Sequence, residues 1–169
     1  MDFLIDADFS TCDGAVVNAS RFNIVRLANV FWTADLDNDG VRSLYCQTIN
    51  VNTNSVAGVA QPIIDGVDAI QIQYGVAANV EDDPANLIQR YQSYTNLVAG
   101  IADPSIRTQN VKAIRIALLV NGGFAGDADS QLEIEQDRNY QMLDASVAID
   151  DDRVLRQVYS TTIAIPNNF

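Results

Sequence analysis

The sequence predicts an all-β or α+β fold built mainly from strands and tight turns, and three observations carry this prediction. Hydrophobic residues make up 48% of the 169 residues, which is enough for a single domain, residues 1–169, to bury a sizeable core. Val, Ile and Thr, which favour strands, alternate with polar residues in several segments. Asn, Asp and Gly supply turns between those segments. An all-α fold is disfavoured.

The N-terminal part predicts a β-hairpin. Two apolar-rich segments, 22–33 and 41–51, show partial alternation and are expected to be strands. Asp37-Asn38-Asp39-Gly40 lies between them. Asn and Asp tolerate a positive φ and Gly adopts one without steric cost, so this tetrapeptide predicts the hairpin turn.

A turn and a regularly alternating strand follow. Pro62 fixes φ, and Asp65-Gly66 has the chemistry of a turn. Apolar side chains then recur at every second position of a predicted strand, 67–77; they are Ile70, Ile72, Tyr74 and Val76.

The middle of the chain is less regular. Glu81-Asp82-Asp83-Pro84 ends the preceding strand, and Pro84 could open a helix. On such a helix Leu87, Tyr91, Tyr94 and Val98 would share one face. Asp103-Pro104 marks a further break.

Three more strands are expected in the C-terminal part, at 111–121, 142–149 and 154–165. The acidic, Gly-containing stretch 122–129 predicts an exposed loop between the first two of them.

The charge excludes one class of partner. The net charge of −12, from 22 acidic and 10 basic residues, repels nucleic-acid phosphates and anionic lipid surfaces. We therefore expect no nucleic acid to bind this domain, and the acidic surface serves mainly solubility.

Two cysteines, Cys12 and Cys46, are compatible with one disulfide or with two buried thiols. The chain has no His and no C-x-x-C motif, so zinc is disfavoured. A disulfide of this span would stabilise the fold by roughly 4 kcal/mol in the chain-entropy model, and it would imply an oxidising compartment.

One segment resembles a calcium loop. Asp35, Asp37 and Asp39 alternate and precede Gly40, so their carboxylates could converge on a hard cation. The twelfth position of this loop is Cys46, where an EF-hand has a bidentate Glu, and the flanks predict strands. An EF-hand is excluded. A simpler calcium turn and an acidic hairpin tip remain as alternatives.

Catalysis has little support in the sequence. Without His, neither a Ser-His-Asp nor a Cys-His arrangement can form. Paired carboxylates could act as acid and base, but their spacing singles out no pair. Trp32 and the pairs Tyr91 with Tyr94 and Tyr159 with Phe169 could stack on a sugar, although aromatic residues on strands usually pack in the core.

Four segments resemble one protein family and occur in that family's order. They are Ser43-Leu44-Tyr45-Cys46, the segment from Gln61 to Val76, the strand from Asn110 to Val120 and the closing strand from Asp151 to Ile165. Together they resemble the PilW-type minor pilins of type IV pili and their relatives, the J-type pseudopilins of type II secretion. The resemblance runs roughly from Asp2 to Ile165 and is poor over 50–60 and 79–109.

The resemblance implies a fold and a role. The fold is α+β, a pilin-like head dominated by antiparallel sheet, whose N-terminal transmembrane helix is absent here, with residues 1–9 as its remnant. The role is non-catalytic and needs no cofactor: the subunit primes or assembles a type IV pilus by binding other minor pilins or pseudopilins and the major pilin. The family also has residues 89–92 extended and favours the disulfide between Cys12 and Cys46.

Further expectations follow from the same resemblance. Such a protein is anchored in the inner membrane with a periplasmic head before assembly and is extracellular in the pilus afterwards. It meets the membrane only through the missing helix, whose removal should leave an exposed apolar groove. The alternative is a secreted carbohydrate-binding or adhesin module with a calcium turn; a carboxylate-only hydrolase ranks below both.

Overall fold

A computed structural model describes residues 9–14, 16–17, 27–38, 40–51, 53–77, 87–122 and 131–165. The chain divides into two compact units, Met1–Asp68 and Ala69–Phe169, which are described separately below. Both consist mainly of antiparallel strands, and two short helices belong to the second, so the fold is α+β and dominated by sheet, as predicted. That residues 1–169 form one domain stays a prediction, and residues 1–8 of the expected helix remnant lie outside the described residues.

The first unit is built around strand β4. β3 (Leu27–Ala34) and β4 (Ser43–Asn50) form the predicted antiparallel hairpin, with Ala34 opposite Ser43. Asn38 and Gly40 in its connection have φ values of 59° and 84°, which the Asn and Gly of the sequence allow. β4 also pairs with β5 (Ser55–Val56) and β6 (Gln61–Asp65). β1 (Phe9–Ser10) and β2 (Val16–Val17) form a separate two-stranded ribbon.

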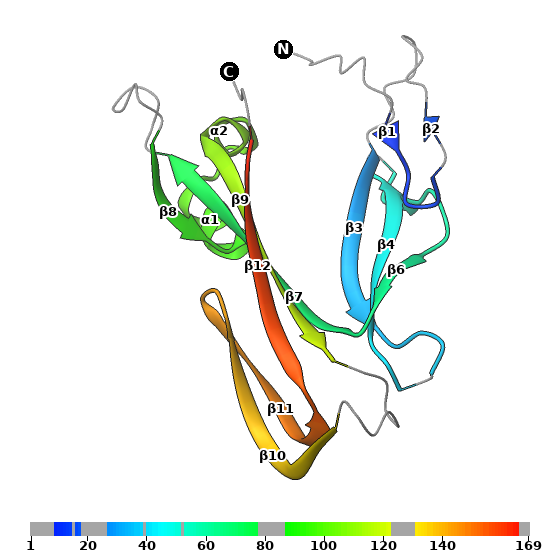
Figure 1. Cartoon of the computed structure of the whole chain (residues 1–169). Helices are drawn as coiled ribbons and strands as arrows, with labels where there is room; N and C mark the ends of the chain where they lie inside the picture. The colour runs from blue at the N-terminus through cyan, green and yellow to red at the C-terminus, as the bar shows by residue number, and fades with distance from the viewer. Residues whose placement is uncertain are drawn as a thin grey trace. The chain divides into compact units, whose positions relative to one another are not determined.

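The second unit contains a four-stranded sheet in the order β12-β9-β7-β8 (Figure 1). β7 (Val67–Ala77) follows the turn at Gly66, whose φ is 76°. β8 spans Ile88–Gln92, β9 Val111–Asn121 and β12 Arg156–Ala164. The strands expected at 67–77 and 111–121 are therefore present with the predicted bounds, and that expected at 154–165 begins two residues later.

The helix predicted from Pro84 onward is wrong over β8, whereas Tyr94 and Val98 do lie on a helix. Tyr91 lies on β8, because β8 pairs antiparallel with β7, and this long-range pairing overrides the local apolar spacing. The helix begins later, as α1 (Tyr94–Gly100), where the hydroxyl of Ser93 accepts a hydrogen bond from the Asn96 N–H. The extended conformation implied by the family for residues 89–92 is confirmed.

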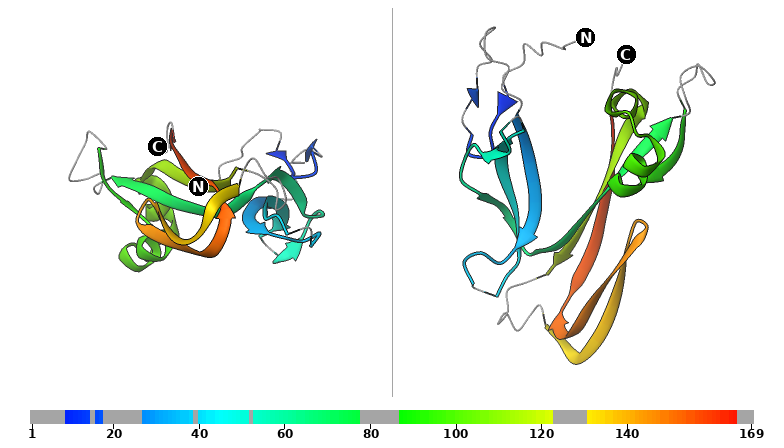
Figure 2. Two further views of the ribbon diagram at one scale, coloured as in Figure 1. Left: turned by 60° about the horizontal axis from the view of Figure 1, so that its bottom comes forward. Right: turned by 180° about the vertical axis from the view of Figure 1, so that it is seen from behind.

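A second helix occupies the break predicted at Asp103-Pro104. α2 (Pro104–Asn110) has Asp103 as its N-cap and Pro104 in its first turn, where a missing N–H costs nothing. α1 and α2 lie close together near one end of the sheet (Figures 1 and 2).

The region expected to hold one strand at 142–149 holds a hairpin. β10 (Gln131–Met142) and β11 (Ala145–Val154) pair antiparallel and are joined through Leu143 and Asp144. Leu143 adopts a φ of 50°, a conformation that Gly or Asn usually supplies, so of the two turn residues only Asp144 is of a type that favours turns. The loop predicted at 122–129 lies, apart from Gly122, outside the described residues.

Two apolar clusters hold the second unit together. Ala117 and Leu119 of β9 pack against Met142 of the β10–β11 hairpin, and all three are nearly inaccessible. Leu97 of α1 packs with Val76 and Val111 at the other end of the sheet. Among the described residues, no helix has the length and apolar character needed to cross a membrane.

Candidate interaction surface

Strand alternation divides the side chains of β9 between two faces of the sheet. Ala113, Ala117 and Leu119 are buried, and the last two lie under the β10–β11 hairpin, so we call this side the hairpin face. The opposite side carries the even-numbered residues of β9, which are half-buried; the apolar ones are Ile114, Ile116, Leu118 and Val120. The β period of two thus places four consecutive apolar side chains on one side of a single strand.

β12 extends this apolar side. Tyr159 lies opposite Leu118 and Ile163 lies opposite Ile114, and these two β12 side chains are 55% and 52% exposed. We call the six residues Ile114, Ile116, Leu118, Val120, Tyr159 and Ile163 the apolar face. Neither apolar cluster of the unit contains any of them. Contiguous apolar surface of this kind marks interaction sites in soluble proteins.

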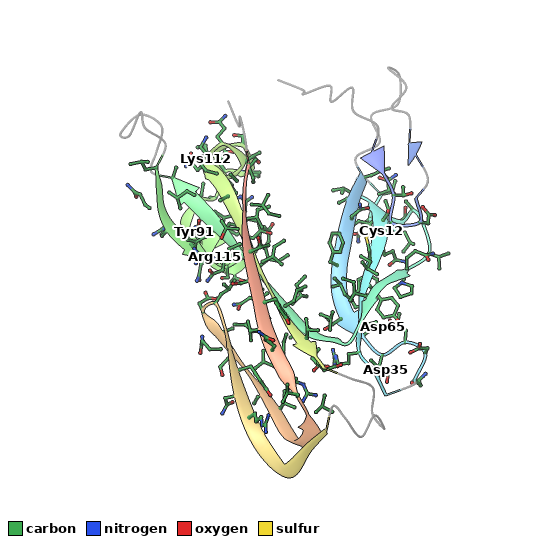
Figure 3. All side chains as sticks on the ribbon, in the orientation of Figure 1. Cys12, Asp35, Asp65, Tyr91, Lys112 and Arg115 are labelled. Atoms are coloured by element: carbon green, nitrogen blue, oxygen red, sulfur yellow. A yellow bond between two sulfur atoms is a disulfide. The ribbon has the colours of Figure 1, made fainter. Side chains whose placement is uncertain are left out.

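The hairpin face carries a cation between the parts of β9 that contact α1 and the β10–β11 hairpin. The guanidinium of Arg115 lies over the Tyr91 ring, with its Cζ 3.7 Å from the ring centroid (Figure 3). Arg115 Nε also donates a hydrogen bond to Thr162 Oγ1 on β12, 3.4 Å away. The nearby Gly75 leaves the space that the Tyr91 ring occupies. Alternation along β9 could have revealed this cation, because Arg115 is the only basic odd-numbered residue of the strand.

A cavity of about 370 Å³ lies beside the helices of the same unit. Its lining is mixed; the residues are Val76, Ala77, Gln89, Arg90, Ile101, Ile106 and Asn110. This lining supplies neither a carboxylate pair nor a nucleophilic side chain, so it offers no machinery for carboxylate-only hydrolysis.

The half-buried side chain of Tyr74 on β7 packs against Tyr94 of α1. Burial raises the pKa of Tyr74 above its ordinary value, and the neighbouring Tyr94 raises it further. The two rings lie 6.1 Å apart between centroids and are tilted. This pair has the character of packing between β7 and α1.

In the first unit Cys12 and Cys46 form the disulfide that the sequence favoured, with their Cα atoms 5.6 Å apart. It ties the turn after β1 to β4, where Cys46 is 3% exposed. The Cys12 N–H donates to Thr48 Oγ1, and that hydroxyl donates to Asn29 Oδ1. The disulfide therefore has a structural role in a buried part of the sheet.

The proposed calcium turn is only partly described. One oxygen of Asp35 accepts a hydrogen bond from the Gly40 N–H at 3.2 Å, whereas its Oδ1 is buried without a hydrogen-bond partner. Asp37 is exposed, and Asp39 lies outside the described residues. Within the described part of the chain, no group of three or more acidic, Cys or His side chains could hold a metal ion.

The aromatic residues considered for sugar stacking have other contacts where the structure describes them. Trp32 stacks on Tyr45 with 5.9 Å between ring centroids, as a cross-strand pair of β3 and β4. Tyr91 lies under Arg115. Tyr94 and Tyr159 are exposed, but Tyr94 packs on Tyr74 and the Tyr159 hydroxyl donates to Gln157 Oε1. Phe169 lies outside the described residues.

Comparison with known proteins adds a family to this geometry. The model of the family described as Type IV Pilus-assembly protein W matches residues 31–167, which include the second half of β3, all of β4 and every described element of the second unit. Neither the curated proteins nor the solved structures contain a significant match to the chain. Because the matched region covers most of the sequence, the chain belongs to the PilW family of type IV pilus-assembly proteins.

Proposed function

We propose that this protein is a non-catalytic minor pilin subunit that primes or assembles a type IV pilus by binding other minor pilins. Family membership supports a role in type IV pilus assembly, contact with other pilus components and a place in the cell envelope or the pilus. The finer assignment depends mainly on one observation, the apolar face of β9 and β12, with Tyr159 and Ile163 more than half exposed.

The apolar face suits such a partner for a physical reason. Removing apolar surface from water contributes about 25 cal/mol per Å², which offsets the loss of freedom on association, and a subunit that assembles into a filament needs that contribution at its contacts. We propose that the major pilin and J-type pseudopilin-like subunits belong to the same set of partners, and that the head is periplasmic until assembly and extracellular in the pilus.

The test is copurification with the pilus-assembly proteins encoded beside this chain's gene, under oxidising conditions. We expect a stoichiometric complex on size-exclusion chromatography. Replacing Ile163 by Lys should weaken that complex by about tenfold or more, because a charge is then buried without a partner. Val59→Lys is the matched control, since Val59 is 72% exposed and lies in the first unit. If the chain forms a complex with none of these proteins, the minor-pilin assignment is overturned.

A second candidate function has one observation in its favour. The buried Oδ1 of Asp35, without a hydrogen-bond partner, is an oxygen that a cation could satisfy, as a secreted carbohydrate-binding or adhesin module with a calcium turn would require. Calcium bound to the folded chain would raise its melting temperature. A melting temperature unchanged by chelator and by added calcium would leave Asp35, Asp37 and Asp39 as an acidic hairpin tip.

A further inference from the structure

β12 is an edge strand of the second unit's sheet. It pairs antiparallel with β9 without a register shift, from Arg156 opposite Asn121 to Ala164 opposite Ala113. No other strand in the described part of the chain pairs with β12. Its outer side is therefore a row of backbone donors and acceptors at which a sheet can be extended.

The hydrogen-bond register identifies the outward backbone groups. The Ile165 N–H donates to the Lys112 carbonyl at 2.8 Å, and the Gly122 N–H donates to the Leu155 carbonyl at 2.7 Å. Ile165 with Lys112 and Leu155 with Gly122 are thus hydrogen-bonded pairs of the antiparallel ladder. Because such pairs recur at every second residue, the odd-numbered residues of β12 turn their N–H and C=O groups toward β9. The residues that turn these groups outward include Val158, Ser160, Thr162 and Ala164.

This edge lacks the features that natural proteins use to protect an edge strand. After Arg156 the strand contains no charge, no Pro and no Gly, and its pairing with β9 contains no bulge. All residues from Tyr159 to Ala164 are exposed. Eight uncharged residues, of which Tyr159 to Ala164 are all exposed, make a good template for strand addition.

The charges on β9 and β12 indicate what kind of strand could add to the edge of β12. β9 and β12 together carry three basic residues and no acidic residue, in a chain with 22 acidic residues. On the hairpin face an added strand would lie beside Ser160 and Thr162, with Arg115 behind them; on the other face it would meet Tyr159 and Ile163. A complementary strand thus alternates acidic or polar residues with apolar ones.

A second copy fits this edge less well. Pairing two β12 strands would bring together two ribbons that both carry basic and no acidic residues, and each chain has a net charge of −12. We propose that β12 accepts an extended, acid-bearing strand of another pilus-assembly subunit by β-strand addition. This inference rests on the proposed function, which supplies the subunit.

Amide exchange measured by NMR in the free chain and in the copurified complex tests the proposal directly. In the free chain the amides of Ser160 and Thr162 should exchange fast, while those of Thr161 and Ile163 are protected by β9. In the complex Ser160 and Thr162 should become protected as well. Fast exchange at both positions in a stoichiometric complex would overturn the strand addition and leave the proposed function intact.

A backbone substitution gives the second test. Ser160→Pro removes one outward N–H while every donor toward β9 remains, a change that edge strands tolerate. It should weaken the complex by about tenfold, whereas Ser160→Ala should bind as the unchanged chain does. Equal binding by both variants would overturn the inference even where Ile163→Lys abolishes binding. Protection that grows with chain concentration alone would identify a second copy as the occupant instead, and a chain that binds no subunit would overturn both proposals.

Discussion

The disulfide is the residue-scale feature with the largest expected effect on stability. Cys12 and Cys46 close a loop with a sequence separation of 34, so removing the bond should lower the free energy of unfolding by roughly 4 kcal/mol. Urea unfolding of the unchanged chain with and without reductant measures this difference. The Cys12→Ser, Cys46→Ser double variant is the control and should be insensitive to reductant. An unchanged midpoint on reduction would contradict the prediction.

Gly75 is a position at which any side chain meets its neighbours. A Cβ added there would lie 2.9 Å from Tyr91 Cε1 and 3.3 Å from Ala113 Cβ. Tyr91 is covered by the Arg115 guanidinium, so it has little room to move away. We expect Gly75→Val to destabilise the fold by about 1–3 kcal/mol through overpacking.

The matched control for Gly75 is Gly58→Val. The nearest atom to a Cβ at Gly58 is Asp13 Oδ2 at 3.4 Å, an ordinary contact. Calorimetric melting of both variants makes the comparison. Equal losses of stability at the two glycines would show that the loss of glycine itself, and not the contact with Tyr91, is responsible.

Asp103 should make the stability of α2 depend on pH. The hydroxyl and then the N–H of Ser105 donate to its carboxylate at 2.7 and 2.8 Å and hold the pKa of Asp103 below its ordinary value. A carboxyl group whose pKa is lowered by folding stabilises the fold above its unfolded pKa, about 3.9, and this contribution disappears as pH falls through the lower folded value.

The corresponding measurement compares Asp103→Ala with Asp103→Asn. Asp103→Ala should melt slightly lower than the unchanged chain at pH 7, and the difference should shrink below about pH 4. The effect is small because this carboxylate is exposed. Asp103→Asn keeps an N-cap without a titrating group, so its melting temperature should lack the pH-dependent contribution of the Asp103 carboxylate. A difference between Asp103→Ala and the unchanged chain that grows toward acid pH would contradict the assignment.

At the scale of elements, the β10–β11 hairpin should depend on Met142. This side chain is 1% exposed and packs on Ala117 and Leu119 of β9. Met142→Ala should cost about 2–5 kcal/mol, because the cavity left behind adds to the lost burial. Asn139→Ala, at an exposed position of the same strand, should change stability by no more than about 0.5 kcal/mol. Similar losses in both variants would show that the hairpin is not anchored by this cluster.

Secondary structure was predicted best where a strand carries its own pattern. The alternation from Ile70 to Val76 predicted β7, and the predicted bounds of β9 are those observed. The predicted helix began too early because the start of α1 depends on Ser93 following a strand that is fixed by pairing with β7. The β10–β11 hairpin was not predicted because its turn places Leu143, a residue that rarely adopts a positive φ, before Asp144.

At the scale of the whole molecule, charge predicts that the chain does not bind nucleic acid. With 22 acidic residues against 10 basic ones, phosphate groups are repelled over most of the surface. We expect fluorescence anisotropy with labelled duplex DNA to give an affinity weaker than about 10⁻⁴ M at physiological salt, the weak end of ordinary nonspecific binding. Saturable binding at lower concentrations that weakens with added salt would contradict this prediction.

The sheet-dominated fold, the pair of cysteines and the family can be recognised in the sequence, because turn residues, two-residue alternation and ordered motifs are local properties of the chain. The covered side of β9 cannot be recognised there, since it depends on the β10–β11 hairpin, whose contact with Ala117 and Leu119 is long-range. The same holds for β12: alternation predicted a strand, but its place at an edge follows from the order β12-β9-β7-β8. The sequence therefore contains every residue of the apolar face but does not show that these residues form one exposed surface.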